Sequence, residues 1–399
     1  MLLFAASLWN PHSPPLTEAA VWVCGDRIAF AGKKSELPEE AAREKQRLDL
    51  GEVVLLPGLV NAHAHSELSA LAGLKRSGDF VAWIRDILQA KQALDPLRQE
   101  EEMHEGILRL LRGGTTTLGD HLSVDANPEA LLRSPLRGKA FLEVLGVVPE
   151  VAVDMARAAE LFRNRWRNLS PRFELIPSPH SVHALDPEVL REVLHDPARV
   201  HSIHLAESEA ERRYFSENSG PLQELIASRG VPTPPRSSSA IRELDSMGLL
   251  DDRVLAVHGN YLEGEEISML AERGISLVHC PFSHAYFGHR PFPMQACRAA
   301  GLNVALGTDS LASASTLSML EVLRETERRF PFLSRQEIFA LATHGGAKAL
   351  KMDPWVGSLE AGKKADLIAV PQVGEAPDSL FAATEVCFAM IDGEILTKF

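Results

Sequence analysis

Two histidines, two positions apart, follow an apolar run near the start of the chain and are the first candidates for chemistry. His63 and His65 close the segment 57–65, whose other residues are mostly Leu, Val and Ala. On an extended strand, residues i and i+2 face the same side, so both imidazoles can point into one site. Taken alone this spacing is weak evidence, because surface or structural histidines can share it.

Further residues of the same kind end other apolar runs. His204 lies near the end of the run in 202–205, His258 ends the run in 256–258, and Asp309 follows the run in 305–307. Active-site groups of a parallel α/β barrel lie at the carboxyl ends of its strands, and packing is a poor explanation for such placements. Three histidines and one carboxylate suit a first-row divalent ion, with one position left for water. Zinc is the expected ion and iron is the alternative.

Glu207 is the candidate proton carrier. A bound ion lowers the pKa of its water toward ~7, and a hydrolase then also needs an acid for the leaving group. Glu207 lies three residues beyond His204, where the strand runs into its loop. The alternative role is a carboxylate at a helix N-terminus, which the helix dipole favours. The two roles are compatible.

Composition and missing motifs narrow the function. A net charge of −13 argues against nucleic acid or an anionic membrane as a partner. The sequence has no GxSxG, GxxxxGK[ST] or HExxH motif. The four cysteines lack CxxC spacing, which fits a reducing cytoplasm. No apolar run reaches the ~18 residues of a membrane span.

Eight apolar runs alternate with stretches of helical period, such as 187–194 and 264–273. The runs end at His63, Gly119, Leu145, Ser178, Leu205, His258, His279 and Gly307. Eight strand–helix units predict an α/β fold with a TIM-type (β/α)8 barrel rather than an open sheet.

Both ends of the chain read as short strands with turns between them. Gly25-Asp26 separates two apolar runs, and Asp392-Gly393 marks a similar turn near the C-terminus. We therefore expect residues 1–56 and 353–399 to form one small β-sandwich domain, and residues 57–352 to form the barrel.

Four segments carry a family resemblance that covers nearly the whole chain: 57–65, 204–207, 307–310 and 357–367. They resemble the amidohydrolase superfamily, in particular its cytosine, guanine and S-adenosylhomocysteine deaminase and chlorohydrolase group. The resemblance implies that the metal ligands are His63, His65, His204 and Asp309. It also implies that Glu207 shuttles protons and that His258 and Asp309 steady the attacking water and the intermediate.

The resemblance also bears on the substrate. Residues 173–215, 241–245 and 308–313 look like bacterial aminodeoxyfutalosine deaminases. Binuclear relatives place a carboxylated lysine on the fourth strand, but segment 178–183 has none, so one ion is expected and His180 is free to contact substrate. Trp83 either contacts substrate as well or anchors the helix 80–87 in the core. The roles of His183, His279 and His284 stay open, as loop or cavity-lining residues.

The resulting hypothesis is a metal-dependent aminohydrolase that acts on a C–NH2 group of a purine-like or other nitrogen heterocycle. A chlorohydrolase or a cyclic amidase on the same scaffold is the enzymatic alternative. A non-enzymatic binding protein is a further alternative, but it would be expected to have lost a metal ligand. The expected partner is a small heterocyclic substrate, and a homo-oligomer stays open.

Overall fold

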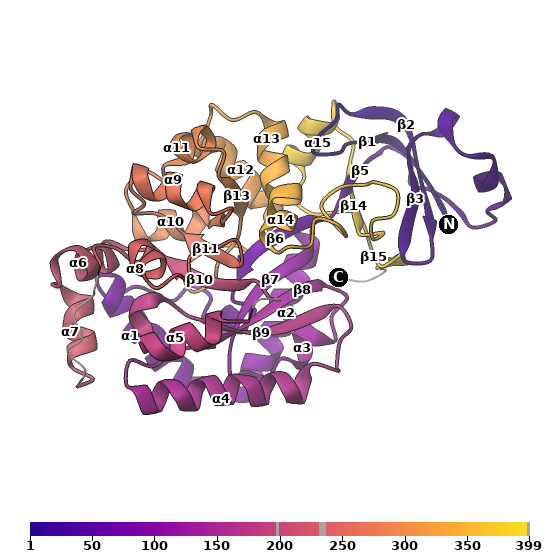
Figure 1. The fold of residues 1–399 in the computed structure, drawn as a ribbon. Coiled ribbons are helices and arrows are strands. Elements are labelled where there is room, and N and C mark those ends of the chain that lie inside the picture. The colour runs from indigo at the N-terminus through magenta and orange to yellow at the C-terminus, as the bar shows by residue number, and fades with distance from the viewer. Residues whose placement is uncertain (197–198, 231–236, 397–399) are drawn as a thin grey trace.

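A computed structural model describes residues 1–196, 199–230 and 237–396. Figure 1 shows an open β unit at one side and a larger unit of strands and helices beside it. Most of the proline- and serine-rich run 232–239 lies outside the described residues. Its last residue, Ser239, caps the following helix by accepting a hydrogen bond from the backbone N–H of Arg242.

Both ends of the chain contribute strands to one sheet, in the order β16-β15-β14-β5-β1-β2-β3, with β4 paired to β1. The strands are β1 (Leu2–Leu8), β2 (Leu16–Cys24), β3 (Arg27–Lys33), β4 (Arg47–Asp49), β5 (Val53–Pro57), β14 (Leu367–Pro371), β15 (Phe388–Ile391) and β16 (Glu394–Ile395). The first and last parts of the chain meet where β14 pairs antiparallel with β5. These strand pairings form one sheet. The arrangement of the terminal domain as a β-sandwich stays a prediction.

The middle of the chain forms two four-stranded parallel sheets. One contains β6 (Leu59–Ala64), β7 (Thr115–Ser123), β8 (Arg137–Val144) and β9 (Phe173–Pro179), and the other contains β10 (His201–Leu205), β11 (Val254–His258), β12 (Ser276–His279) and β13 (Asn303–Leu306). Single parallel bridges, Ser181 with His204 and Ala64 with Asp309, connect the sheets at both pairs of edges. Both connections therefore lie beside predicted metal ligands.

Helices cover these parallel strands, which are buried on both faces as such strands usually are. Among the described residues the α-helices are α1 (Phe80–Ala93), α2 (Pro96–Arg112), α3 (Glu129–Leu132), α4 (Pro149–Trp166), α5 (Pro187–Leu194), α6 (Glu209–Glu217), α7 (Pro221–Ala227), α8 (Ala240–Ser246), α9 (Gly264–Glu272), α10 (Pro281–Phe287), α11 (Met294–Ala299), α12 (Met319–Arg329), α13 (Arg335–Ala340), α14 (Gly346–Ala349) and α15 (Ala376–Ala382). Asp95 and Asp186 cap α2 and α5 through their side chains, and a proline at the first helical position follows each. None of the helices in the described part of the chain is long and apolar enough to span a bilayer.

Candidate metal centre and active site

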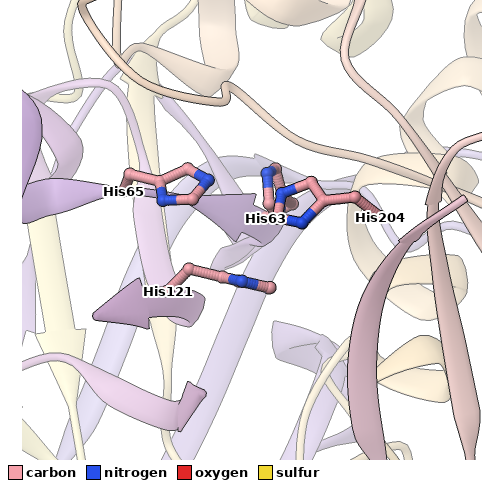
Figure 2. Close-up of side chains that lie close together, drawn as sticks. All are labelled: His63, His65, His121 and His204. Carbon is pink, nitrogen blue, oxygen red and sulfur yellow. The ribbon is translucent and has the colours of Figure 1, made fainter. Parts of the chain in front are cut away.

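Three predicted metal ligands meet at the carboxyl ends of β6 and β10. His63 lies on β6, His65 directly beyond it, and His204 on β10. The ring centroid of His63 is 4.9 Å from that of His65 and 5.1 Å from that of His204. Figure 2 shows these rings gathered at one point together with His121, and one nitrogen of each ring lies within 4.8 Å of the others.

The fourth predicted ligand, Asp309, lies at the same point. Its Oδ1 is 3.8 Å from Nε2 of His63 and 3.9 Å from Nε2 of His65. The backbone N–H of Ser310 donates to Oδ1 at 2.7 Å, and the hydroxyl of Ser313 donates to Oδ2 at 3.0 Å. These bonds fix the carboxylate with its remaining lone pairs available to a cation.

The donors fit a divalent cation. Both ring nitrogens of His63 lack a hydrogen-bond partner among the described residues, although the side chain is fully buried. Leaving such a group unpaired costs about 1–3 kcal/mol, a cost that a bound cation removes. Burial lowers the pKa of His63 to about 3, so the ring is the neutral form that binds metal. Burial alone would raise the pKa of Asp309, but the neighbouring His63 and His258 hold it well below its usual range.

A hydrogen bond also sets the tautomer of His204. Its Nδ1 lies 2.8 Å from the backbone carbonyl oxygen of His180. A carbonyl only accepts, so Nδ1 must carry the proton and Nε2 is left with a free lone pair. Such a carbonyl partner is the usual support of a metal-binding histidine.

The backbone is strained where the strands deliver these side chains. Ala206, His258 and Asp309 have φ values of 50°, 76° and 62°, in the left-handed region that non-glycine residues avoid at a cost of about 1–2 kcal/mol each. All three lie at or just beyond the end of a strand. Strained residues held in place by their surroundings cluster at functional sites, because the strain fixes side-chain direction.

Glu207 faces this centre and has a fixed backbone. Its Oε1 is 3.4 Å from Nε2 of His258. The carboxylate of Glu211 accepts hydrogen bonds from the backbone N–H groups of Ala206 at 2.9 Å and Glu207 at 2.8 Å, and the side-chain amide of Asn260 donates to the Glu207 carbonyl at 3.0 Å. Burial, together with the nearby Asp309, raises the pKa of Glu207 well above its usual value. The raised pKa makes the Glu207 carboxylate a stronger base than an ordinary carboxylate, as proton transfer from water requires.

Two residues beside the cluster, His121 and Glu143, were not predicted from the sequence. His121 lies with its Nδ1 3.3 Å from Oε1 of Glu143 and its Nε2 2.9 Å from the hydroxyl of Ser202. Oε1 of Glu143 also lies 2.7 Å from Nδ1 of His180. The one available signal was an acidic residue inside the otherwise apolar end of β8.

A cavity of about 270 Å³ opens from the metal ligands toward α1 and α7. Of the predicted substrate contacts, His180, Trp83 and Glu207 line it, and His183 does so as well. The indole N–H of Trp83 donates to the backbone carbonyl of Ala312 at 3.3 Å, so Trp83 is a core anchor and a wall of the cavity at once. In the described part of the chain, His279 and His284 are not among the lining residues. His279 instead stacks on Phe292 with ring centroids 4.0 Å apart.

Residues 54–396 match the model of the amidohydrolase family. The chain belongs to this family. The amidohydrolase is 31% identical to a 5-methylthioadenosine/S-adenosylhomocysteine deaminase from Nitratidesulfovibrio vulgaris (strain Hildenborough), with 88% of this chain and 80% of the relative covered. It is 30% identical to an aminodeoxyfutalosine deaminase from Deinococcus radiodurans, and the match covers 88% of this chain and 85% of the relative. A zinc-bound adenosine deaminase structure from Xanthomonas campestris has the same fold, with a TM-score of 0.83 at 24% identity over 99% of this chain and 92% of that one.

The family membership confirms that this amidohydrolase is an enzyme that hydrolyses C–N bonds. Its buried histidine and carboxylate donors support a divalent metal ion as the cofactor. The likeness to the zinc-bound structure supports the α/β fold.

Proposed function

We propose that this amidohydrolase is a metal-dependent deaminase that replaces the exocyclic amino group of an adenine-type nucleoside with oxygen. The observation that carries the proposal is the placement of Glu207 beside His258 and Asp309, in a cavity that begins at the metal-ligand cluster. The relatives support the substrate class, since one is named for methylthioadenosine and S-adenosylhomocysteine, which share an adenine nucleoside. Aminodeoxyfutalosine is the second candidate substrate.

The proposed ligands are His63, His65, His204 and Asp309. Nitrogen and carboxylate donors of this kind favour zinc, with iron as the alternative. When bound, such an ion supplies a nucleophilic hydroxide at neutral pH. We propose one ion per chain, because the segment 178–183 offers no lysine to bridge a second one.

Glu207 carries the protons in this proposal. It accepts a proton from the attacking water and delivers it to the ring nitrogen next to the reacting carbon. Glu207 then takes the second proton from the oxygen that has been added to this carbon and passes it to the amino group, so that the carbon–oxygen bond becomes a carbonyl as the carbon–nitrogen bond breaks and ammonia leaves. Burial lowers the pKa of His258 to about 3, so its ring is neutral. The neutral ring can form a hydrogen bond with the oxygen of the attacking water without becoming charged.

His180 is the proposed substrate contact. The carboxylate of Glu143 accepts a hydrogen bond from its Nδ1 at 2.7 Å, which leaves Nε2 free to meet a ligand. Burial alone would lower the pKa of His180, but Glu143 raises it above its ordinary value. The ring can therefore donate a hydrogen bond to a heterocyclic nitrogen, at ~2.7–3.2 Å.

The architecture is part of the proposal. The two bridges between the parallel sheets lie at both pairs of edges, which supports closure of the eight strands into a (β/α)8 barrel. The pairing of β14 with β5 supports a small terminal domain from residues 1–56 and 353–399.

The test is a screen of adenine nucleosides with zinc-loaded protein, read by ammonia release and by the change in ultraviolet absorbance. Deamination that a chelator abolishes and zinc restores would support the proposal. A protein that releases chloride from a chlorinated triazine, and no ammonia from any adenine nucleoside, would instead be the chlorohydrolase alternative.

A further inference from the structure

A buried glutamate in the first turn of α6 holds the backbone of Glu207, the proposed proton carrier. Glu211 is the third residue of α6, and its carboxylate accepts hydrogen bonds from the N–H groups of Ala206 at 2.9 Å and Glu207 at 2.8 Å. Its own N–H donates to the hydroxyl of Ser208, the residue that caps the helix, at 3.2 Å. Glu211 therefore links α6 to the turn that carries Glu207.

The first turn of α9 shows what a glutamate at this helix position ordinarily does. Glu266 is also the third residue of its helix and is also buried. Its carboxylate accepts a hydrogen bond at 2.8 Å from the N–H of Glu263, the residue that caps α9, which completes a capping box. The carboxylate of Glu211, by contrast, reaches past the capping residue Ser208 to the two residues before it. This reach is more than the capping of α6 requires.

The turn between β10 and α6 has a strained backbone that needs such a support. Ala206 lies two residues after the proposed metal ligand His204 and directly before Glu207, and its φ of 50° is in the left-handed region. A left-handed residue can turn successive N–H groups toward one point, where they bind an anion. In this turn the anion is the carboxylate of Glu211. Without this acceptor, the two N–H groups would no longer hold the turn in one conformation.

Groups that follow β11 hold the same turn from its other side. The backbone N–H of Tyr261 donates to the Ala206 carbonyl at 2.9 Å, and the side-chain amide of Asn260 donates to the Glu207 carbonyl at 3.0 Å. These bonds fix the carbonyl groups of the turn, whereas Glu211 fixes its N–H groups. The direction of the Glu207 side chain therefore depends on both sets of bonds.

We propose that Glu211 is a positioning residue for deamination: it holds the backbone of Glu207 so that the Glu207 carboxyl group meets the attacking water and the substrate ring. This inference rests on the proposed function, because it takes Glu207 to be the proton carrier. Glu207 lines the cavity and Glu211 does not, so Glu211 acts through Glu207 and not on the substrate. The plainer role of Glu211 is to cap α6, as Glu266 caps α9.

Two matched glutamine variants separate the two roles. Glu211→Gln keeps the size of the side chain, but the amide has one acceptor oxygen and its NH2 group cannot accept from the second N–H. Burial raises the pKa of Glu211 to about 7, although the backbone N–H groups of Glu207 and Ala206 lower it, so we expect a neutral side chain of this size to be tolerated. Glu266→Gln is the control, because it makes the same change at the same position of a helix whose capping glutamate does not line the cavity.

For zinc-loaded Glu211→Gln we expect kcat to fall about 10- to 100-fold, with KM within about threefold of wild type and metal content unchanged, because a small misplacement of a reacting group is costly. Glu266→Gln should leave kcat within about twofold. In the Glu207→Gln background, where the proton carrier is already removed, Glu211→Gln should lower kcat by less than about threefold, since residues that act as a unit are not additive.

Four results would overturn the proposal. These are an equal loss of kcat in both backgrounds, a kcat of Glu211→Gln within about twofold of wild type, loss of bound metal together with activity, and a Glu211→Gln protein that does not fold in the presence of zinc. The last result would mean that Glu211 supports the whole fold and not the direction of one side chain.

Crystal structures of the zinc-loaded proteins test the placement of Glu207 without any substrate. In Glu211→Gln the Glu207 carboxyl group should move by about 1 Å or more from its wild-type position, and in Glu266→Gln it should not move. An unmoved carboxyl group in Glu211→Gln would contradict the proposal. Failure of the proposed function would look different: full turnover of Glu207→Gln, or a wild type that deaminates no adenine nucleoside, rejects that function, and the crystal structures still decide whether Glu211 positions Glu207.

Discussion

The two ends of strand β8 hold two buried polar clusters with opposite properties. Near the carboxyl end, Glu143 joins the histidines around the proposed metal site. At the amino end, Arg137 lies among the carboxylates of Asp366 and Asp392, which come from the C-terminal part of the chain. One strand thus ties a reactive centre to the contact between the barrel strands and the terminal sheet.

The cluster around Arg137 satisfies its charges within the protein. The guanidinium of Arg137 donates to both carboxylates, and Asp392 also pairs with Arg172 at 2.7 Å and with Lys364 at 3.0 Å. Buried charges persist when they are paired and hydrogen-bonded. In the cluster near the carboxyl end of β8, by contrast, His63 of strand β6 is fully buried, and neither of its ring nitrogens has a hydrogen-bond partner among the described residues.

The difference teaches where to look for function. A buried polar cluster that is complete without a ligand stabilises the fold, whereas one that is incomplete is built for something the protein binds. The same division holds for α/β barrels in general, whose carboxyl ends carry the chemistry and whose amino ends carry stability. Four variants test this contrast.

The largest effect is expected for His63→Ala. Loss of one of four proposed ligands should abolish activity and reduce bound metal well below one equivalent, while the variant stays folded. Because an unpaired buried ring is removed, the metal-free variant should unfold close to the metal-free wild type, and added zinc should no longer raise its unfolding temperature. Metal analysis and thermal unfolding with and without zinc measure both. Retention of metal and full turnover would show that His63 is not a ligand, and two equivalents in the wild type would contradict a single ion.

Glu207→Gln comes next. The amide keeps the size of the side chain but cannot accept a proton, so kcat should fall about 10²–10⁴-fold with metal content unchanged. Glu209→Gln is the matched control, because Glu209 is an exposed carboxylate two residues away. Turnover of the Glu207 variant within about threefold of wild type would place the proton shuttle elsewhere. Loss of metal together with activity would make Glu207 a ligand or a structural group.

The sequence predicted most of the strand ends to within one residue, because the parallel strands are short, mostly apolar runs bounded by polar or turn-forming residues. The predicted ends at His258 and His279 are the last residues of β11 and β12. β7 was the exception, since it continues to Ser123, four residues beyond the predicted Gly119. Its last four residues, 120–123, include the polar Asp120, His121 and Ser123, so the apolar pattern stops early and His121 was missed.

The residues around Glu143 could not be predicted for a related reason. Its partners, His121 and His180, come from β7 and from the residue after β9, and only the register between parallel strands brings them together. Sequence periodicity gives the face of a strand but not its neighbours. The apolar face of α1 was visible in the same way, whereas its pairing with α7 around one cavity was not.

Arg137→Met tests the other end of β8. Removing the guanidinium leaves Asp366 buried without its cation, which should lower the free energy of unfolding by about 3–5 kcal/mol. Urea unfolding of the zinc-loaded protein measures the loss, and kcat of the folded variant should stay within about twofold of wild type, as for a purely structural change. Arg133→Met is the control, since its pair with Glu129 is exposed and should contribute at most about 1 kcal/mol. A fall in kcat at unchanged stability would mean that this cluster acts on the site.

The smallest effect concerns Asp392→Asn and depends on pH. Burial alone would raise the pKa of Asp392, but hydrogen bonds from Arg172, Lys364 and Arg137 lower it to about 2. Asn is the suitable replacement, because Asp392 has a φ of 52° and asparagine tolerates that conformation. The unfolded carboxyl group titrates near ~3.9, so its ionised form stabilises the folded protein above that pH, and the stabilisation disappears as the pH falls to about 2.

The variant should therefore lose about 1 kcal/mol between pH 5 and 8, a value reduced for solvent screening of a partly exposed group. Its difference from wild type should shrink as the pH falls from about 4 toward 2. Denaturant unfolding of chelator-treated protein over this range makes the comparison without the metal, whose loss in acid would otherwise contribute. A difference that stays constant down to pH 2 would mean that Asp392 acts by shape and hydrogen bonding. If the cluster around Arg137 is complete without a ligand, the stability difference between Asp392→Asn and wild type should depend on pH only in this acid range, where the Asp392 carboxylate takes up its proton.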